Sequence, residues 1–262
     1  MITRKSKLEI QTMREAGKIV SAVHAIVGDA VRPGVTTLVL DKLAEEIIRS
    51  RGAVPTFLGY RGFPASICAS INEEVVHGIP SAKRVLRDGD IFKLDVGATL
   101  DGLVADAAIT IPVGEVGEDV KKLIRCTRDS LFRGIEAATI GNRISDISFA
   151  VEDVANKNQL GIVRDYGGHG VGHRLHEEPH IPNHGAPGRG VRLKAGYCLA
   201  IEPMFNLGTD EVRELDDRWT VVTADSRWSA HFEHSIAITE EGPLLLTLPD
   251  GASQPYLNGA VL

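Results

Sequence analysis

The segment from residue 91 to residue 112 constrains the fold most, because it predicts a β-hairpin with one aspartate on each strand. Apolar residues dominate both arms, and the Asp101-Gly102 pair between them is a strong signal for a two-residue turn. Asp95 precedes this turn and Asp106 follows it. We therefore expect two adjacent antiparallel strands, each with a carboxylate among apolar neighbours.

Two strand registers are compatible with this turn, and each places Asp95 and Asp106 on one face of the hairpin. If the turn residues form the whole loop, Leu100 faces Leu103 and the aspartates are diagonal neighbours, whereas a shift of two residues makes them direct partners. Two carboxylates this close can share one cation, and they repel unless a proton or a metal lies between them. The alternative is a pair of solvated acids on an outer face, so residues elsewhere in the chain must decide.

Composition restricts the class of protein but not its activity. The 262 residues can bury a sizeable core, and 43% hydrophobic with 24% charged residues is ordinary for a globular protein. The net charge of −6 argues against broad electrostatic binding to nucleic acid. No apolar run is long enough to span a membrane, and the N-terminus lacks the apolar stretch of a signal peptide. Cys68, Cys126 and Cys198 are odd in number and far apart, which argues against disulfides or a thiolate zinc site and favours the cytoplasm.

The predicted elements occur in a similar order in the two halves of the chain. We expect helices at 8–31 and 36–52, a strand at 66–71, the hairpin, and helices at 118–139 and 144–160. This order indicates a weak internal duplication, with halves of about 8–112 and 118–240 and a strand-lined cleft where they meet. Since no linker separates the halves, we predict one α+β domain over residues 1–262, with a frayed tail over the last dozen residues.

The second half is dense in histidine and in isolated acids. The segment DYGGHGVGHRLHEEPHIPNHG, residues 165–185, contains five histidines, and its glycines and prolines predict a loop. Predicted strands at 196–204 and 231–239 carry Glu202 and Glu233 among apolar neighbours, and a shorter strand is expected at 219–223. Each acid taken singly could form a salt bridge with an arginine. Four such acids and a glycine-flanked histidine are more simply explained by one shared metal site.

The donor set restricts the metal. Oxygen-rich coordination with one imidazole suits manganese, iron, cobalt or zinc. The excess of carboxylates over histidines favours two divalent ions, about 3.5–4 Å apart, over one.

Seven motifs together resemble the type I methionine aminopeptidases over roughly residues 8–239. They are HGIP at His77, DVG at Asp95, the second acid at Asp106, GGHGVG at His169, HEEP at His176, IEPM at Glu202 and FEHS at Glu233. The resemblance implies the pita-bread (creatinase/aminopeptidase-like) fold, in which two pseudo-symmetric halves surround a curved antiparallel sheet with helices on its outer face.

The resemblance also implies a ligand set for two divalent metal ions. Asp106 and Glu233 would bridge the ions, Asp95 would bind one of them, and His169 with Glu202 would bind the other. The identity of the ions, among cobalt, manganese, iron and zinc, stays open.

By the same resemblance, three side chains act on the substrate. His77 would lie near the scissile amide nitrogen, His176 would contact and polarise the carbonyl oxygen, and Glu202 would pass a proton from water to the leaving amine. The ions would lower the pKa of the attacking water.

The residues that match the methionine side-chain pocket of the family are Phe57, Tyr60, Phe63, Cys68, Leu175 and Trp219. Such a pocket would select an unbranched thioether by fit, and ordinary core packing is the alternative.

The chain departs from the family pattern at three places. Arg174-Leu175 replaces a small residue followed by an aromatic one, Phe63 replaces a frequent tyrosine, and His231 stands where glutamine is common.

We therefore expect a cytoplasmic, monomeric enzyme that removes the initiator methionine from nascent chains with a small second residue. The absence of an N-terminal extension resembles the short bacterial form. The basic cluster Lys83, Arg84 and Arg87 is either a solvated loop or a contact with the ribosome. The alternatives are an Xaa-Pro peptidase of the same fold and a non-catalytic binding protein. A mononuclear iron oxygenase would need the opposite ratio of histidines to carboxylates.

Overall fold

The predicted hairpin lies within a nine-stranded antiparallel sheet in the described part of the chain. The computed structural model describes residues 2–249 and 251–252, so most of the predicted frayed tail, 253–262, lies outside the described residues. The path of the sheet is β1-β4-β5-β14-β9-β7-β8, with β2 added beside β4 and β15 beside β14. These strands are β1 (Val54–Pro55), β2 (Ile67–Ile71), β4 (Ile91–Leu100), β5 (Leu103–Pro112), β7 (Gly167–Gly170), β8 (Glu177–Pro182), β9 (Cys198–Ile201), β14 (Glu233–Thr239) and β15 (Gly242–Leu245).

Two small sheets flank the large one. One has the order β13-β10-β6, and the other has the order β11-β12-β3. Their strands are β3 (Glu74–Val76), β6 (Gly161–Ile162), β10 (Met204–Asn206), β11 (Val212–Glu214), β12 (Val221–Thr223) and β13 (Ser229–His231).

The hairpin has the unshifted register. Leu100 pairs with Leu103 and Gly97 pairs with Asp106, so Asp95 and Asp106 are diagonal neighbours, the first of the two predicted registers. Their side chains lie on one face, as both registers predicted. Both turn residues have positive φ, 48° at Asp101 and 77° at Gly102, which is the conformation that a type I′ turn requires. The turn chemistry therefore determines which face carries the carboxylates.

Four helices form where the sequence predicts them. They are α1 (Lys7–Ala30), α2 (Thr37–Ser50), α3 (Glu118–Ala137) and α4 (Ile144–Asn158), and one 3-10 turn, η1 (Tyr60–Gly62), lies between α2 and β2. A capping box between Ser6 and Glu9 begins α1, and the Thr36 hydroxyl accepts a hydrogen bond from Val39 N–H at the start of α2. None of these helices has the length and apolar content needed to cross a membrane.

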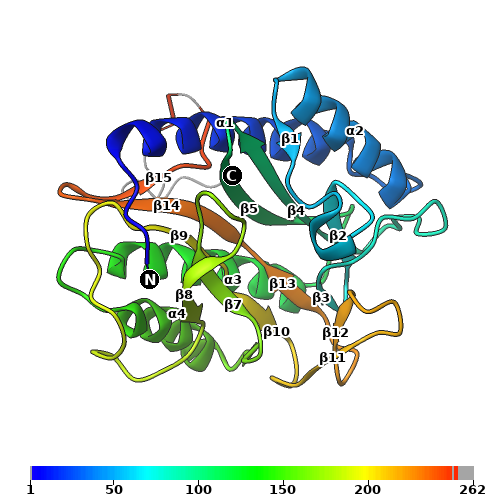
Figure 1. Cartoon of the computed structure of the whole chain (residues 1–262). Helices are drawn as coiled ribbons and strands as arrows, with labels where there is room; N and C mark the ends of the chain where they lie inside the picture. The colour runs from blue at the N-terminus through cyan, green and yellow to red at the C-terminus, as the bar shows by residue number, and fades with distance from the viewer. Residues whose placement is uncertain (1, 250, 253–262) are drawn as a thin grey trace.

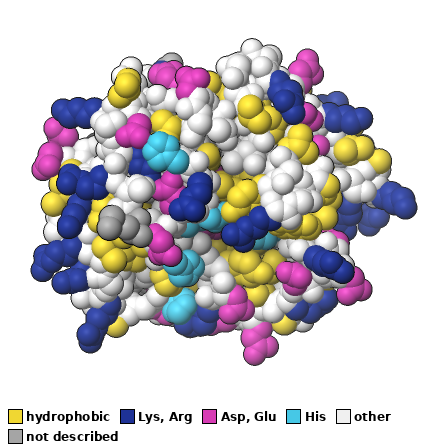
Figure 2. Space-filling view, in the orientation of Figure 1, with side chains coloured by type: hydrophobic (Ala, Val, Ile, Leu, Met, Phe, Trp, Pro, Cys, Tyr) yellow, Lys and Arg dark blue, Asp and Glu magenta, His cyan; other side chains and the backbone are white. Residues whose placement is uncertain are grey.

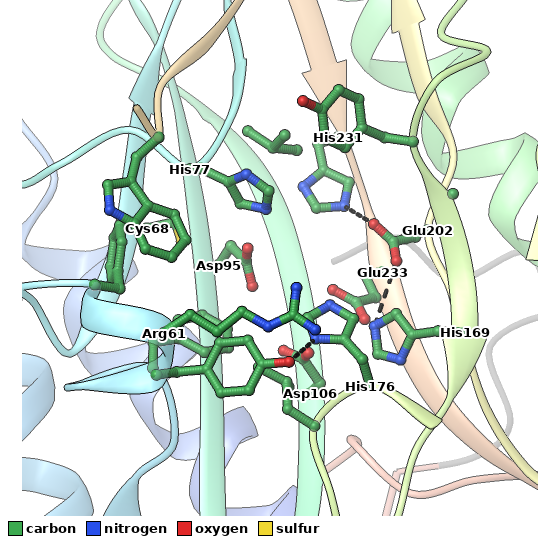
Figure 3. A pocket seen from close by; sticks show the side chains of 18 of the residues that line it. Arg61, Cys68, His77, Asp95, Asp106, His169, His176, Glu202, His231 and Glu233 are labelled. Carbon is green, nitrogen blue, oxygen red and sulfur yellow. Dashed lines mark hydrogen bonds and ion pairs between the residues drawn. The ribbon is translucent and has the colours of Figure 1, made fainter. Parts of the chain in front are cut away.

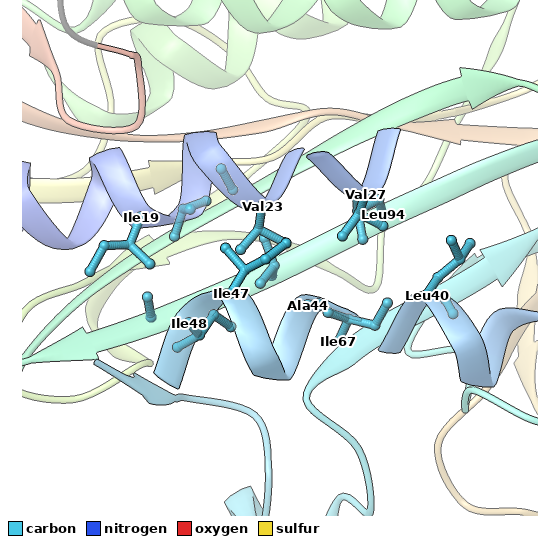
Figure 4. Close-up of a cluster of buried hydrophobic side chains, with 14 of the residues drawn as sticks. Ile19, Val23, Val27, Leu40, Ala44, Ile47, Ile48, Ile67 and Leu94 are labelled. Atoms are coloured by element: carbon cyan, nitrogen blue, oxygen red, sulfur yellow. The ribbon is translucent and has the colours of Figure 1, made fainter. Parts of the chain in front are cut away.

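Alternate residues of the large sheet face the helices. On β4, Leu94, Val96 and Ala98 pack against α1 and α2 in one apolar cluster (Figure 4). Leu199 and Ile201 of β9 pack in the same way against α3 and α4. In Figure 1 the two helix pairs lie at different ends of the sheet. The residues in between, including Asp95, point to the opposite face, and the site lies there.

The prediction of a loop over residues 165–185 is wrong, because β7 and β8 lie within it. A Cβ at Gly168 would overlap the Ala200 carbonyl oxygen, and one at Gly170 would overlap the Glu178 carbonyl oxygen. These glycines allow neighbouring strands to approach His169 closely instead of marking a loop.

Two longer predicted strands are interrupted. The strand predicted at 196–204 ends at Ile201, because Pro203 has no N–H to donate to a neighbouring strand. Glu202 lies between β9 and β10, where the strand is interrupted. The second is divided at Phe232, whose N–H donates to the Pro203 carbonyl oxygen at 3.3 Å. Both interruptions lie beside acids that line the site.

Helix α1 provides a matched pair of substitutions that tests its packing. A Cβ at Gly17 would overlap the Leu246 carbonyl oxygen, whereas a Cβ at Gly28 would meet only the Ile111 side chain, at 3.6 Å. We expect Gly17→Ala to lower the free energy of unfolding by about 1–3 kcal/mol. Gly28→Ala should leave it unchanged or raise it by up to ~1 kcal/mol, through better helix propensity. Urea unfolding measures both, and equal stability of the two variants would contradict this packing.

Candidate active site

The inner face of the sheet brings all five predicted metal ligands together (Figure 3). They are Asp95 on β4, Asp106 on β5, His169 on β7, Glu202 directly after β9 and Glu233 at the start of β14. The pairing of the strands explains why these five side chains lie close together. Glu233 is opposite Ala108 and His169 is opposite Ala200, so each ligand lies on a strand next to that of another ligand.

The distances between these side chains suit a shared cation. Ligand atoms of Asp106, His169 and Glu233 all lie within 4.8 Å of one another, and all three residues are buried. His169 Nε2 is 3.5 Å from Glu202 Oε1. Donor atoms at such separations can each approach one ion to the usual 2.0–2.2 Å or so.

The four carboxylates are electrostatically unfavourable without a cation. Burial raises the pKa of Asp95 to about 7. Burial also raises the pKa of Asp106, Glu202 and Glu233 well above the usual range, and the neighbouring carboxylates raise each of them further. Asp95 Oδ1, Asp106 Oδ1 and Glu233 Oε1 are buried without a hydrogen-bond partner. Buried anionic oxygens that lack partners fit divalent metal ions.

His169 is prepared to act as a neutral donor. Its Nδ1 lies 2.9 Å from the Gly170 carbonyl oxygen, which leaves Nε2 facing the carboxylates. Burial, with the nearby His176, lowers the pKa of His169 to about 3. Metal-ligating histidines commonly donate their other ring N–H to a carbonyl in this way.

The pKa of Asp95 predicts that metal binding depends on pH. Between about pH 4 and pH 7 the folded, metal-free protein holds a proton on Asp95 that the unfolded chain lacks. The protonated carboxyl therefore favours the metal-free folded state at low pH. This contribution to the free energy of unfolding is lost as pH rises through 7. A metal ion must displace such protons.

We expect the affinity for Mn²⁺ or Co²⁺ to fall as pH decreases from 7.5 to 5.5, by about tenfold per pH unit for each proton displaced. Calorimetric titration in two buffers of different ionisation enthalpy counts the protons released. An affinity that is constant over this range, with no proton release, would contradict the assignment of Asp95.

His77 and His176 lie above the carboxylates from two different walls. His77 has a positive φ of 62°, a conformation that costs energy outside glycine and is common at functional sites. Its ring contacts the rings of Tyr166 and Trp219 edge-on, at centroid distances of 5.8 and 6.2 Å. Burial and the nearby His176 lower the pKa of His77 to about 4, so it is neutral at physiological pH.

His176 is oriented by its neighbours. Its Nδ1 lies 2.8 Å from the Tyr60 hydroxyl, and its ring centroid lies 4.3 Å from that of His169. Burial and the Arg61 guanidinium lower the pKa of His176. With Nδ1 occupied by the hydroxyl, Nε2 is the ring nitrogen free for a substrate.

All six predicted pocket residues line the same cavity of about 380 Å³, adjoining the carboxylates: Phe57, Tyr60, Phe63, Cys68, Leu175 and Trp219. Phe63 and Trp219 pack edge to face with ring centroids 5.0 Å apart. The size suits a small ligand, and the apolar walls favour an apolar side chain. In Figure 2 hydrophobic and histidine side chains gather near the centre of one face, with charged side chains around them.

The residues that depart from the family pattern differ in their burial and in whether they line the cavity. Leu175 and Phe63 are pocket walls, whereas Arg174 is exposed and its N–H donates to Glu177 Oε1 at 3.1 Å. His231 is fully buried and lines the same cavity.

Five cavity residues had no predicted role at the site: Arg61, Val76, Asp165, Tyr166 and His180. Tyr166 directly precedes the GGHGVG motif, and that position was the only sequence signal for it. Arg61 lines the cavity with a positive φ of 49°, and its guanidinium carbon lies over the Tyr60 ring, 5.4 Å from the ring centroid. Three histidines had no predicted role. His173 pairs with Glu9 at 2.9 Å on the surface, His180 lines the cavity, and His184 is half-buried.

Comparison with known proteins identifies the family. Residues 11–240 match the model of metallopeptidase family M24. The chain belongs to this family. A methionine aminopeptidase of Clostridium acetobutylicum is 51% identical over 248 residues, covering 95% of this chain and 99% of that protein.

Solved structures of family M24 confirm the predicted α+β pita-bread fold. A methionine aminopeptidase of Thermotoga maritima superposes with a TM-score of 0.93 at 44% identity, over 95% of this chain and all of that one. An Xaa-Pro dipeptidase of Bacillus anthracis shares the fold with a TM-score of 0.75 at 23% identity, and the match covers 61% of its chain. The predicted resemblance to methionine aminopeptidases is thus confirmed, and the chain is a metal-dependent hydrolase.

Proposed function

We propose that the chain removes the N-terminal methionine from new polypeptides whose second residue is small, by metal-assisted hydrolysis of the first peptide bond. One observation supports this most directly. Apolar side chains line the same cavity as a cluster of carboxylates and one imidazole, so a substrate side chain held by the apolar residues would place its own backbone beside the cluster. An exopeptidase that recognises one apolar residue needs this arrangement.

Asp95, Asp106, His169, Glu202 and Glu233 would hold the divalent metal ions, and Asp106 and Glu233 would be shared between two of them. The excess of carboxylates supports two ions, and the donor set suits cobalt, manganese, iron or zinc. When bound, the ions supply Lewis acidity and lower the pKa of a water molecule.

The protein's own side chains position the substrate and move its protons. His176 Nε2 donates to the scissile carbonyl oxygen, since the Tyr60 hydroxyl occupies Nδ1. His77 hydrogen-bonds the amide nitrogen from the opposite wall. Glu202, whose burial raises its pKa, takes a proton from water and returns it to the leaving amine. Phe63 and Trp219 exclude water from the methionine side chain.

The alternatives are not favoured. An Xaa-Pro peptidase shares the fold, but the relatives with high identity over the full chain are methionine aminopeptidases. A non-catalytic binding protein would have no need of four carboxylates and one imidazole gathered in one cavity. An iron oxygenase would need more histidines than carboxylates.

The nascent N-terminus is the proposed partner, and the cytoplasm, where such termini emerge, is the proposed location. We further propose that the chain is one domain over residues 1–262 and acts as a monomer. A ribosome contact through the basic cluster would depend on Lys83 and Arg87, because Arg84 already pairs with Glu74 at 2.5 Å.

The activity is tested with short peptides and metal-loaded protein. We expect methionine release from Met-Ala and Met-Gly peptides with added Mn²⁺ or Co²⁺, little release from Met-Val, and none from Ala-Pro. Amino-acid analysis measures the product. The proposal would be refuted if folded, metal-loaded protein released no methionine from the Met-Ala and Met-Gly peptides. It would also be refuted if the protein cleaved Ala-Pro.

Variants distinguish metal ligands from substrate contacts. Asp106→Ala or Glu233→Ala should abolish turnover and weaken metal binding strongly, since each removes a bridge and leaves neighbouring acids unpaired. His77→Ala should slow turnover by about 10²–10⁴-fold, with metal content unchanged. Metal analysis beside kinetics checks both classes. Wild-type turnover in Asp106→Ala, or loss of metal in His77→Ala, would reverse these roles.

A further inference from the structure

His231 is a buried imidazole in the active site with no assigned partner. The residue is 1% exposed, and both ring nitrogens lack a hydrogen-bond partner. It lies at the end of β13, two residues before Glu233, and lines the cavity. A buried polar ring without partners is costly unless something in the working site satisfies it.

The backbone around His231 is held on several sides. The His231 N–H donates to Thr110 Oγ1 at 3.0 Å, and the Thr110 hydroxyl donates back to the His231 carbonyl oxygen at 2.7 Å. The buried Lys93 ammonium donates to the Ser229 carbonyl oxygen at 2.9 Å, on the same strand. The ring therefore projects from a hydrogen-bonded strand rather than from a loop.

The ring points at Glu202. His231 Nε2 is 3.8 Å from Glu202 Oε2, while His169 Nε2 is 3.5 Å from Glu202 Oε1 (Figure 3). Glu202 thus lies between two imidazoles, one for each oxygen. The Glu202 backbone is also held, because Asn183 Nδ2 donates to its carbonyl oxygen at 3.0 Å.

We propose that His231 is a positioning residue for Glu202: its Nε2–H donates a hydrogen bond to Oε2 and so directs Oε1 toward His169 and the metal. This inference rests on the proposed role of Glu202 as ligand and proton carrier. An ionised carboxylate only accepts hydrogen bonds, and an imidazole N–H is a suitable donor. A shortening of the Nε2–Oε2 distance from 3.8 Å by about 0.6–0.9 Å completes the bond. Outer partners of this kind orient a ligand and tune its affinity for metal.

Three variants test the inference. His231→Leu removes the donor while keeping an apolar side chain, and His231→Gln keeps an N–H donor. His173→Leu is the control, since that histidine is exposed and pairs with Glu9 away from the cavity. Cobalt affinity by chelator competition, the visible absorption of bound Co²⁺, and kcat and KM on Met-Ala-containing peptides are measured for each, with circular dichroism to select folded protein.

We expect His231→Leu to weaken Co²⁺ binding and lower kcat by about 10–100-fold, with an altered cobalt spectrum and little change in KM. His231→Gln should stay within about threefold of the wild type, as should His173→Leu. The proposal would be overturned if His231→Leu bound Co²⁺ with the affinity and the absorption spectrum of the wild type. Equal losses in the leucine and glutamine variants would also overturn it, because the imidazole would then act as a ligand itself.

A double-mutant cycle keeps the proposal testable if one variant is unstable. In a Glu202→Gln background, His231→Leu should cause little further loss of Co²⁺ affinity, because its effect acts through the carboxylate. A full additional loss would show that His231 acts elsewhere. The cobalt measurements do not depend on peptidase activity. A protein that binds cobalt but cleaves no methionine peptide would refute the proposed function, while the comparison of His231 variants would still decide this inference.

Discussion

Mutual repulsion among four buried carboxylates is the constraint on which the rest of this structure depends. Two unit charges about 4 Å apart repel by about 4 kcal/mol at an effective dielectric constant of ~20. A whole domain is stable by only about 5–15 kcal/mol. Asp95, Asp106, Glu202 and Glu233 therefore cannot all be ionised in the folded protein without cations, and their raised pKa values express this. The metal-free protein retains protons in their place.

Three of the histidines that surround the carboxylates are neutral, so they add no charge to the cluster. His77, His169 and His231 all have pKa values lowered by burial, so none is protonated near neutral pH. Apolar side chains and carboxylates line the same cavity. In the proposed function, the apolar residues would hold the substrate side chain and the carboxylates would hold the metal.

Local signals in the sequence were sufficient for much of the fold. The Asp101-Gly102 turn predicted the hairpin and the face shared by its two aspartates, although it left two registers open. The periodic apolar residues predicted all four helices to within a few residues. Two acids on opposite arms of a hairpin with known register must share a face, so half of the site followed from local chemistry. The other half required the motifs at His169, Glu202 and Glu233, whose proximity depends on strand pairing between distant segments.

The errors have physical causes that no short window contains. Gly168 and Gly170 suggested a loop, but they are required by carbonyl oxygens of strands far away in the sequence. Glu202 was expected within a strand, yet Pro203 ends the ladder and leaves the carboxylate in a break. The strand that carries His231 is held by backbone hydrogen bonds to the Thr110 and Lys93 side chains, which lie on two other strands.

The two-residue turn of the hairpin has a consequence for how such a chain can change during evolution. Side chains on a strand alternate between faces, so the length of the loop determines whether Asp106 faces the cations or the helices. Substitutions along the arms preserve this parity, whereas the insertion or deletion of a single residue would move a carboxylate into the apolar layer under α1. Sequence drift is therefore tolerated around this site, but changes in the length of the hairpin are not.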